Sequence, residues 1–178
     1  ITSSAASDVY KRQNYNTDLM KALIDESANL SSQKVNGKYN IHHRVIADHI
    51  RSISFLIAEG IFPTNDGRGY VLRRIMRRAM RHIHFLGVKE PMLYKMVASL
   101  TREMGAAFPE LIEAKQLIEE SLLNEEIKFR STLDRGLKLL DKEISRLNKG
   151  EKFSGEVAFK LYETYGFPID LTQDAVRD

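Results

Sequence analysis

The sequence contains no cysteine and no tryptophan, and only 4 of its 178 residues are proline. Without cysteine the chain can form no disulfide and offers no thiolate to a metal ion, which fits a cytoplasmic protein. No apolar run approaches the roughly 20 residues that a membrane-spanning helix needs, so we expect no membrane contact. No basic segment followed by an apolar one opens the chain, so secretion is not indicated.

Negative charge is missing from a long stretch in the middle of the chain. Between Gly67 and Lys89 there are 7 cationic side chains and no acid. The whole chain carries +3, so the rest of the sequence carries −4. A basic island in a mildly acidic protein indicates a polyanionic partner.

Hydrophobic periodicity predicts helices along most of the chain and no convincing strand. Apolar residues recur at three- and four-residue spacing over about 17–30, 41–59, 68–85, 91–104, 109–147 and 156–165. Turn-forming residues separate these segments, and Pro168 can open a last helix. The stretch 109–147 predicts one long helix, in which Gly136 is the weak point and could mark a kink. We therefore predict an all-α fold.

Residues 1–13 are small and polar and have no helical period. We interpret them as a disordered or non-native leader outside the fold.

The basic island falls on one predicted helix. Its six arginines are Arg68, Arg73, Arg74, Arg77, Arg78 and Arg81. Three of them step by four residues and stack on one face, with Arg74 and Arg78 beside them. Such crowding needs counter-charges, and two sources stay open. The guanidinium groups either pair with glutamates of the long helix or bind a phosphate backbone in bidentate fashion, and both can hold for different arginines.

Other kinds of site have little support. Gly67 and Gly69 bracket the start of the arginine helix, where free N–H groups could accept a phosphate, but a turn followed by a helix cap is the favoured explanation. The five histidines show no metal-ligand spacing, so we expect no metal site. No pattern of serine, histidine and aspartate indicates catalysis, so no residue is assigned a catalytic role.

Four segments in order carry a family resemblance. They are residues 14–19 (NYNTDL), 44–51 (RVIADHIR), 62–79 (FPTNDGRGYVLRRIMRRA) and 161–172 (LYETYGFPIDLT). Together they resemble alanyl-tRNA synthetases, class II enzymes, in the part that follows the third class II motif. The resemblance assigns 14–38 to the end of the class II catalytic domain with a linker, and 39–178 to a helical tRNA-recognition domain with one long helix.

The resemblance implies a role in reading tRNA(Ala). In this family an asparagine and an aspartate approach the G·U wobble pair at the third position of the acceptor stem from opposite grooves. The asparagine matches Asn65, which on sequence alone could equally be a turn or cap residue. The aspartate matches Glu163, with Asp170 as the alternative, and the arginines would hold the stem's backbone. An amide carries donors and an acceptor, enough to read a base edge.

The family enzyme first makes alanyl-adenylate from ATP and then joins alanine to tRNA. By resemblance, ATP and magnesium belong to motifs upstream of Asn14, and zinc belongs to an editing domain outside the chain. We therefore expect a fragment that binds no cofactor, cannot activate alanine alone, and has the rest of the synthetase as its partner. A freestanding helical RNA-binding module without enzymatic descent is the alternative.

Overall fold

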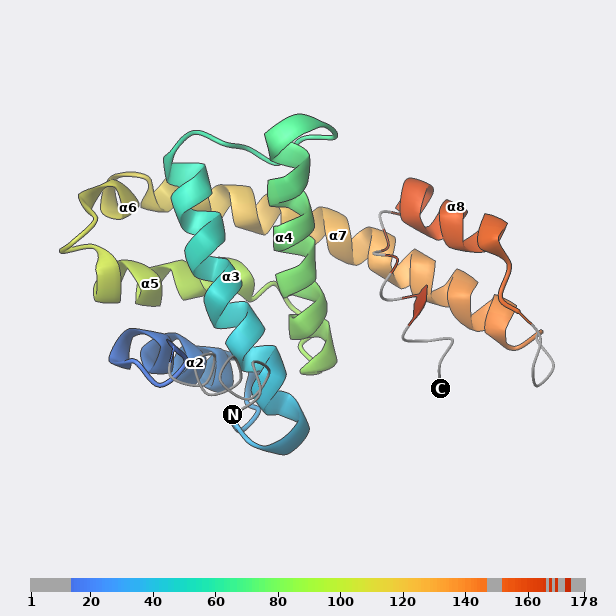
Figure 1. Ribbon diagram of the computed structural model, residues 1–178, viewed down its shortest axis with the longest axis horizontal. Coiled ribbons are helices and arrows are strands. Elements are labelled where there is room, and N and C mark those ends of the chain that lie inside the picture. Colours follow the sequence, from blue (N-terminus) through green and yellow to red (C-terminus); the bar gives the residue numbers. More distant parts are fainter. Residues whose placement is uncertain (1–13, 147–151, 166, 168, 170–171, 174–178) are drawn as a thin grey trace, which may run out of the picture. The chain divides into compact units, whose positions relative to one another are not determined.

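The computed structural model describes residues 14–146, 152–165, 167, 169, 172 and 173. Every regular element within these residues is helical (Figure 1), which confirms the predicted all-α class. In chain order the elements are α2 (Asp18–Ser31), η1 (Gly37–Tyr39), α3 (Asn40–Ala58), α4 (Gly67–Phe85), η2 (Leu93–Lys95), α5 (Met96–Met104), α6 (Pro109–Glu113), α7 (Lys115–Ile144) and α8 (Gly155–Tyr165). Among the described residues, no helix has both the length and the apolar character needed to cross a bilayer.

The chain divides into two compact units, residues 1–125 and 126–178, and the boundary falls inside α7. Helix α2 belongs to the same unit as α3–α6 and packs against α3 and α5. The domain boundary expected between residues 38 and 39 stays a prediction, and the leader 1–13 lies outside the described residues.

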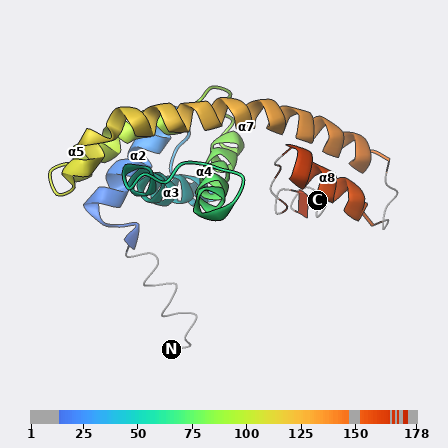
Figure 2. The same cartoon turned by 90° about the horizontal axis from the view of Figure 1, so that it is seen from above.

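Helix α3 is central to the first unit. It packs against α2, α4 and α5, and Figures 1 and 2 both show α3 and α4 side by side. Its fully buried isoleucines are Ile46, Ile50, Ile53 and Ile57. Their three- and four-residue spacing places them on one face, and this periodicity is what predicted the helix from the sequence.

Helix α4 begins and ends where the turn-forming residues predict. The chain enters it through Gly67, whose φ of +57° lies in the left-handed region that glycine adopts without a steric penalty. Leu72, Met76, Ala79 and Ile83 are at most 1% exposed and form its core face. Beyond α4 the chain turns at Gly87. The sequence therefore located this helix correctly.

Two predicted helices have different limits in the structure. Regular structure in the segment 91–104 starts only at the 3-10 turn η2, which leads into α5; such turns are frequent at helix ends. The long helix predicted over 109–147 is present as α7, but it begins only at Lys115, because α6 and α7 are separated at Ala114. Ala114 is not a helix breaker, so packing accounts for the break: α6 buries Leu111 and contacts α3 and α5.

In the second unit, α7 carries Gly136 and α8 contributes the buried Leu161. A Cβ atom built on Gly136 would lie 2.7 Å from Cδ2 of Phe167, which is completely buried. Gly136 therefore makes room for the Phe167 ring. The helix expected to open at Pro168 lies outside the described residues.

Candidate nucleic-acid interface

An exposed row of side chains follows the outer face of α4. Arg68, Arg74 and Arg78 are exposed, and Val71 lies between them with 53% of its surface exposed. We call these four residues the arginine strip. Among the described residues no carboxylate lies within ion-pair distance of its arginines, and Arg74 lies over the Tyr70 ring, 5.9 Å from the centroid. The strip presents guanidinium groups that are open to an anionic partner.

Arg77 is engaged inside the protein instead. Its Nε donates to Oε1 of Glu125 on α7 at 2.8 Å, and the two side chains are only 17% and 6% exposed. The alternative in which a glutamate of the long helix neutralises an arginine therefore holds for Arg77.

Arg81 and Arg73 also lie off the strip. Arg81 is 6% exposed, with its guanidinium 5.2 Å from the centroid of the Phe85 ring, and Arg73 is half-buried. Residues four apart are offset by about 40° around a helix, so the side chains of Arg73, Arg77 and Arg81 do not point in one direction. The row turns gradually around α4, from the half-buried Arg73 to the buried Arg81. The spacing of the arginines does not show whether the arginine strip or the row 73–77–81 faces outward, since that depends on where the other helices pack against α4.

Asn65 lies in the loop that precedes the arginine strip and is exposed. Its side-chain amide makes no hydrogen bond to any part of the chain that the structure describes. The next residue, Asp66, occupies the N-cap position of α4 but makes no side-chain cap hydrogen bond. The amide of Asn65 is therefore open at the end of α4 from which the strip starts.

The two candidate carboxylates belong to the second unit. Glu163 lies on α8 and is exposed, and within the described residues its carboxylate has no ion pair or hydrogen bond. Asp170 lies outside the described residues. Asn65 belongs to the first unit and Glu163 to the second.

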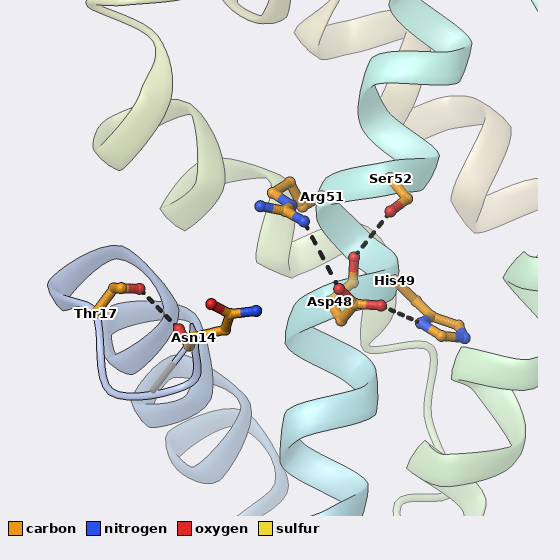
Figure 3. A network of polar contacts seen from close by, with 6 residues as sticks. All are labelled: Asn14, Thr17, Asp48, His49, Arg51 and Ser52. Atoms are coloured by element: carbon orange, nitrogen blue, oxygen red, sulfur yellow. Dashed lines mark hydrogen bonds and ion pairs between the residues drawn. The ribbon is translucent and has the colours of Figure 1, made fainter. Parts of the chain in front are cut away.

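A polar network on α3 surrounds Asp48 (Figure 3). Its Oδ2 lies 3.3 Å from Nδ1 of His49, and its Oδ1 lies 3.7 Å from a terminal nitrogen of Arg51. Ser52 donates its hydroxyl to the Asp48 carbonyl at 3.2 Å. The hydrogen bond with His49, together with the charges of Arg51 and Arg78, lowers the pKa of Asp48. This network keeps Asp48 ionised on the helix that packs beside α4.

Three histidines are held in hydrogen bonds. Nδ1 of His42 lies 2.7 Å from Nδ1 of His82, joining α3 to α4, and Nδ1 of the buried His43 lies 2.9 Å from the Ser27 hydroxyl. Burial lowers the pKa of all three imidazoles, to about 3 for His82. Within the described ranges no three acidic or histidine side chains come together in a way that could hold a metal ion.

Comparison with known proteins identifies the family. The family model described as tRNA synthetases class II (A) matches residues 6–178. The chain belongs to the class II tRNA synthetases (A). The match begins eight residues before Asn14, so it includes part of the segment 1–13, which the sequence predicts to lie outside the fold.

Individual alanine–tRNA ligases are closely similar in sequence to this chain. An alanine–tRNA ligase of Paracoccus denitrificans (strain Pd 1222) is 61% identical over 168 residues, which cover 94% of this chain and 19% of that protein. The alanine–tRNA ligase of Ruegeria pomeroyi is 63% identical over 165 residues, covering 93% of this chain and 18% of the ligase. The chain thus spans about a fifth of the length of these curated relatives.

Two residues beside Asn65 escaped the sequence reasoning. Gly69 faces the loop 62–66, and the Thr64 hydroxyl donates to the Asp66 carbonyl at 2.8 Å. The sequence signal was the second glycine of Gly67-Arg68-Gly69, which the helix itself does not need. From the sequence alone, this glycine indicates only a phosphate cradle or a turn.

Proposed function

We propose that this chain is the part of an alanine–tRNA ligase that grips the acceptor stem of tRNA(Ala) and recognises its G·U wobble pair. The proposal is supported by the family membership and by relatives that are named as alanine–tRNA ligases. The observation that carries it is the open amide of Asn65 at the start of an exposed arginine strip. An amide at the end of a row of cations has the chemistry to read one base pair while the cations hold the backbone.

The arginine strip supplies affinity and register. Arg68, Arg74 and Arg78 can each donate two hydrogen bonds to a phosphate without first breaking an ion pair inside the protein. Arg77 is not expected to contribute in this way, since leaving Glu125 would strand a nearly buried carboxylate. The proposal therefore keeps Arg68, Arg74 and Arg78 as the principal backbone contacts.

Asn65 supplies base recognition in this proposal, and a carboxylate of the second unit supplies the contact from the other groove. Glu163 is exposed and has no partner within the described residues, as such a role requires. Asp170 remains the alternative for the same role. A carboxylate accepts hydrogen bonds from an exocyclic amine and so complements the amide of Asn65.

The chemistry of alanylation is proposed to lie outside this chain. In the full-length ligase, ATP and magnesium would serve alanine activation in the catalytic domain, and zinc would belong to the editing domain. The partners of the chain are then tRNA(Ala) and the remaining domains of the same cytoplasmic synthetase.

Acceptor-stem hairpins that differ at the third base pair test the proposal. In the full-length synthetase, Asn65→Ala should lower the preference for a G·U hairpin over a G·C hairpin by about tenfold, because a well-placed base contact is worth about 1–3 kcal/mol. Affinity for the G·C hairpin should change little. An unaltered preference after Asn65→Ala would refute the assigned base contact.

The exposed carboxylate has its own comparison. Glu163→Gln keeps the size and exposure of the side chain and removes its charge. If Glu163→Gln lowers the preference for G·U and Asp170→Asn leaves that preference unchanged, the contact is assigned to Glu163. The reverse pattern would assign it to Asp170.

A further inference from the structure

The loop that carries Asn65 is packed directly onto the first turn of α4. A Cβ atom built on Gly69 would overlap the carbonyl oxygen of Phe62 and the hydroxyl oxygen of Thr64, and would lie 3.0 Å from the Thr64 Cβ. Gly69 is buried although it stands next to the exposed Arg68. The loop backbone therefore comes as close to α4 as the absence of a side chain at position 69 allows.

The residues on either side of Asn65 are tied to one another. The Thr64 hydroxyl donates to the Asp66 carbonyl at 2.8 Å, and the same carbonyl accepts the Tyr70 amide at 3.0 Å. One oxygen atom thus joins the loop, the N-cap and the first turn of α4. Asn65 lies between the two tied residues, and its own amide is left unbonded within the described residues.

Glycine at position 69 needs an explanation other than the helix. It is the third residue of α4, where alanine would favour the helical conformation more strongly. Its φ is not in the left-handed region, unlike that of Gly67, so backbone conformation does not require glycine either. What remains is the close approach of the loop.

We propose that Gly69 and Thr64 are positioning residues, which hold the amide of Asn65 in the orientation that distinguishes a G·U pair from a G·C pair. The inference rests on the proposed function of Asn65. A base-reading group has to be held within roughly 0.5 Å of its productive position, and a loop ordered in advance loses less entropy on binding. A side chain at position 69 displaces the Phe62 carbonyl by more than this tolerance. Loss of the Thr64 hydroxyl removes the hydrogen bond to the Asp66 carbonyl, which joins the residues on either side of Asn65.

The test compares Gly69→Ala, Thr64→Val and Thr64→Ser with Asn65→Ala in the full-length synthetase. The measured quantity is the ratio of kcat/KM for acceptor-stem hairpins with G·U and with G·C at the third pair. Gly69→Ala should lower this ratio about tenfold, as Asn65→Ala does. Thr64→Val should lower it about threefold, the equivalent of one neutral hydrogen bond, and Thr64→Ser should restore it because the hydroxyl is kept.

A matched glycine serves as the control. Gly155 is also the first-turn glycine of a helix, but a Cβ atom built on it meets nothing within 4 Å, so Gly155→Ala should leave the ratio unchanged. If Gly69 had only a structural role, Gly69→Ala would lower kcat/KM for both hairpins by the same factor. Such an equal decrease would overturn the inference.

The outcomes separate the inference from the proposed function. Loss of discrimination in Asn65→Ala but not in Gly69→Ala or Thr64→Val would overturn the positioning role alone. Full discrimination in Asn65→Ala would overturn the proposed function. If Gly69→Ala does not fold, the comparison of Thr64→Val with Thr64→Ser decides, and equal ratios for these two would overturn the inference.

Discussion

The Nδ1 atoms of His42 and His82 lie 2.7 Å apart across the contact between α3 and α4. At this distance the Nδ1–H of one neutral imidazole donates a hydrogen bond to the unprotonated Nδ1 of the other, and the bond cannot form when both rings are protonated. Arg78 and Arg81 on α4, together with His49 on α3, disfavour the protonated form of His82. The pair is thus a point where protonation opposes the packing of the helix that carries the arginine strip.

The stability of the chain should fall in mild acid for this reason. Burial, the partner histidine and Arg81 hold the pKa of His82 at about 3, and burial also lowers the pKa of His42. Between about pH 6.5 and pH 3 the unfolded chain therefore binds more protons than the folded protein. The free energy of unfolding should decrease toward low pH by up to about 1.4 kcal/mol per pH unit through His82, and by less through the more exposed His42.

Urea unfolding at several pH values measures this dependence. His82→Gln should make the curve flatter between pH 6.5 and 4, because one of the two groups no longer titrates. An identical slope in the wild type and in this variant would contradict the assignment.

The ion pair between Arg77 and Glu125 should contribute to stability. Glu125→Ala removes the acceptor of the 2.8 Å bond and leaves the Arg77 charge nearly buried. We expect the free energy of unfolding to fall by about 2 kcal/mol. Glu113→Ala is the control, since Glu113 is exposed and, among the described residues, has no polar partner; it should change stability by less than about 0.5 kcal/mol. Equal effects of the two substitutions would show that the pair adds nothing.

The arginine strip should determine the salt dependence of RNA binding. Each arginine that contacts a phosphate adds about one unit to the slope of log affinity against log salt concentration, or slightly less. Arg78→Gln should therefore reduce the slope by about one unit, and Arg74→Gln by a similar amount. Arg77→Gln should leave the slope unchanged under conditions where the variant is folded. If Arg77→Gln and Arg78→Gln reduce the slope equally, the division of the α4 arginines into an outer strip and an inner row is refuted.

Gly136→Ala should destabilise the second unit although alanine is the better helix former. The added methyl group would lie 2.7 Å from the Phe167 ring, and overpacking of this kind costs about 1–3 kcal/mol. That cost outweighs the gain of about 1 kcal/mol from helix propensity. In a Phe167→Ala background the same substitution should become stabilising, and thermal unfolding of the two single variants and the double variant measures the coupling. Additive effects would contradict the contact.

The chain alone should not activate alanine. The proposal places adenylate formation outside residues 1–178, so an ATP–pyrophosphate exchange assay with alanine should give only the background rate. A clear alanine-dependent rate would refute it.

Local signals were sufficient for most helix positions. Helix α3 and helix α4 follow from their apolar spacing and from the turn formers that separate them, because these effects act within a few residues. The break at Ala114 was missed since no local residue causes it. Asn65 was singled out by resemblance, and its exposure agrees with the role proposed for it, while the contact of Gly69 with its loop could not be read from residue types.

The sequence by itself determined the helical class, the family and the position of the arginine helix. Only the tertiary structure decided which arginines remain available to a partner. A local sequence pattern cannot distinguish among the six arginines of this helix. The carboxylate that binds Arg77 comes from Glu125, 48 residues away along the chain. Helical periodicity describes one helix at a time, and the burial of a charge depends on which other helix passes over it.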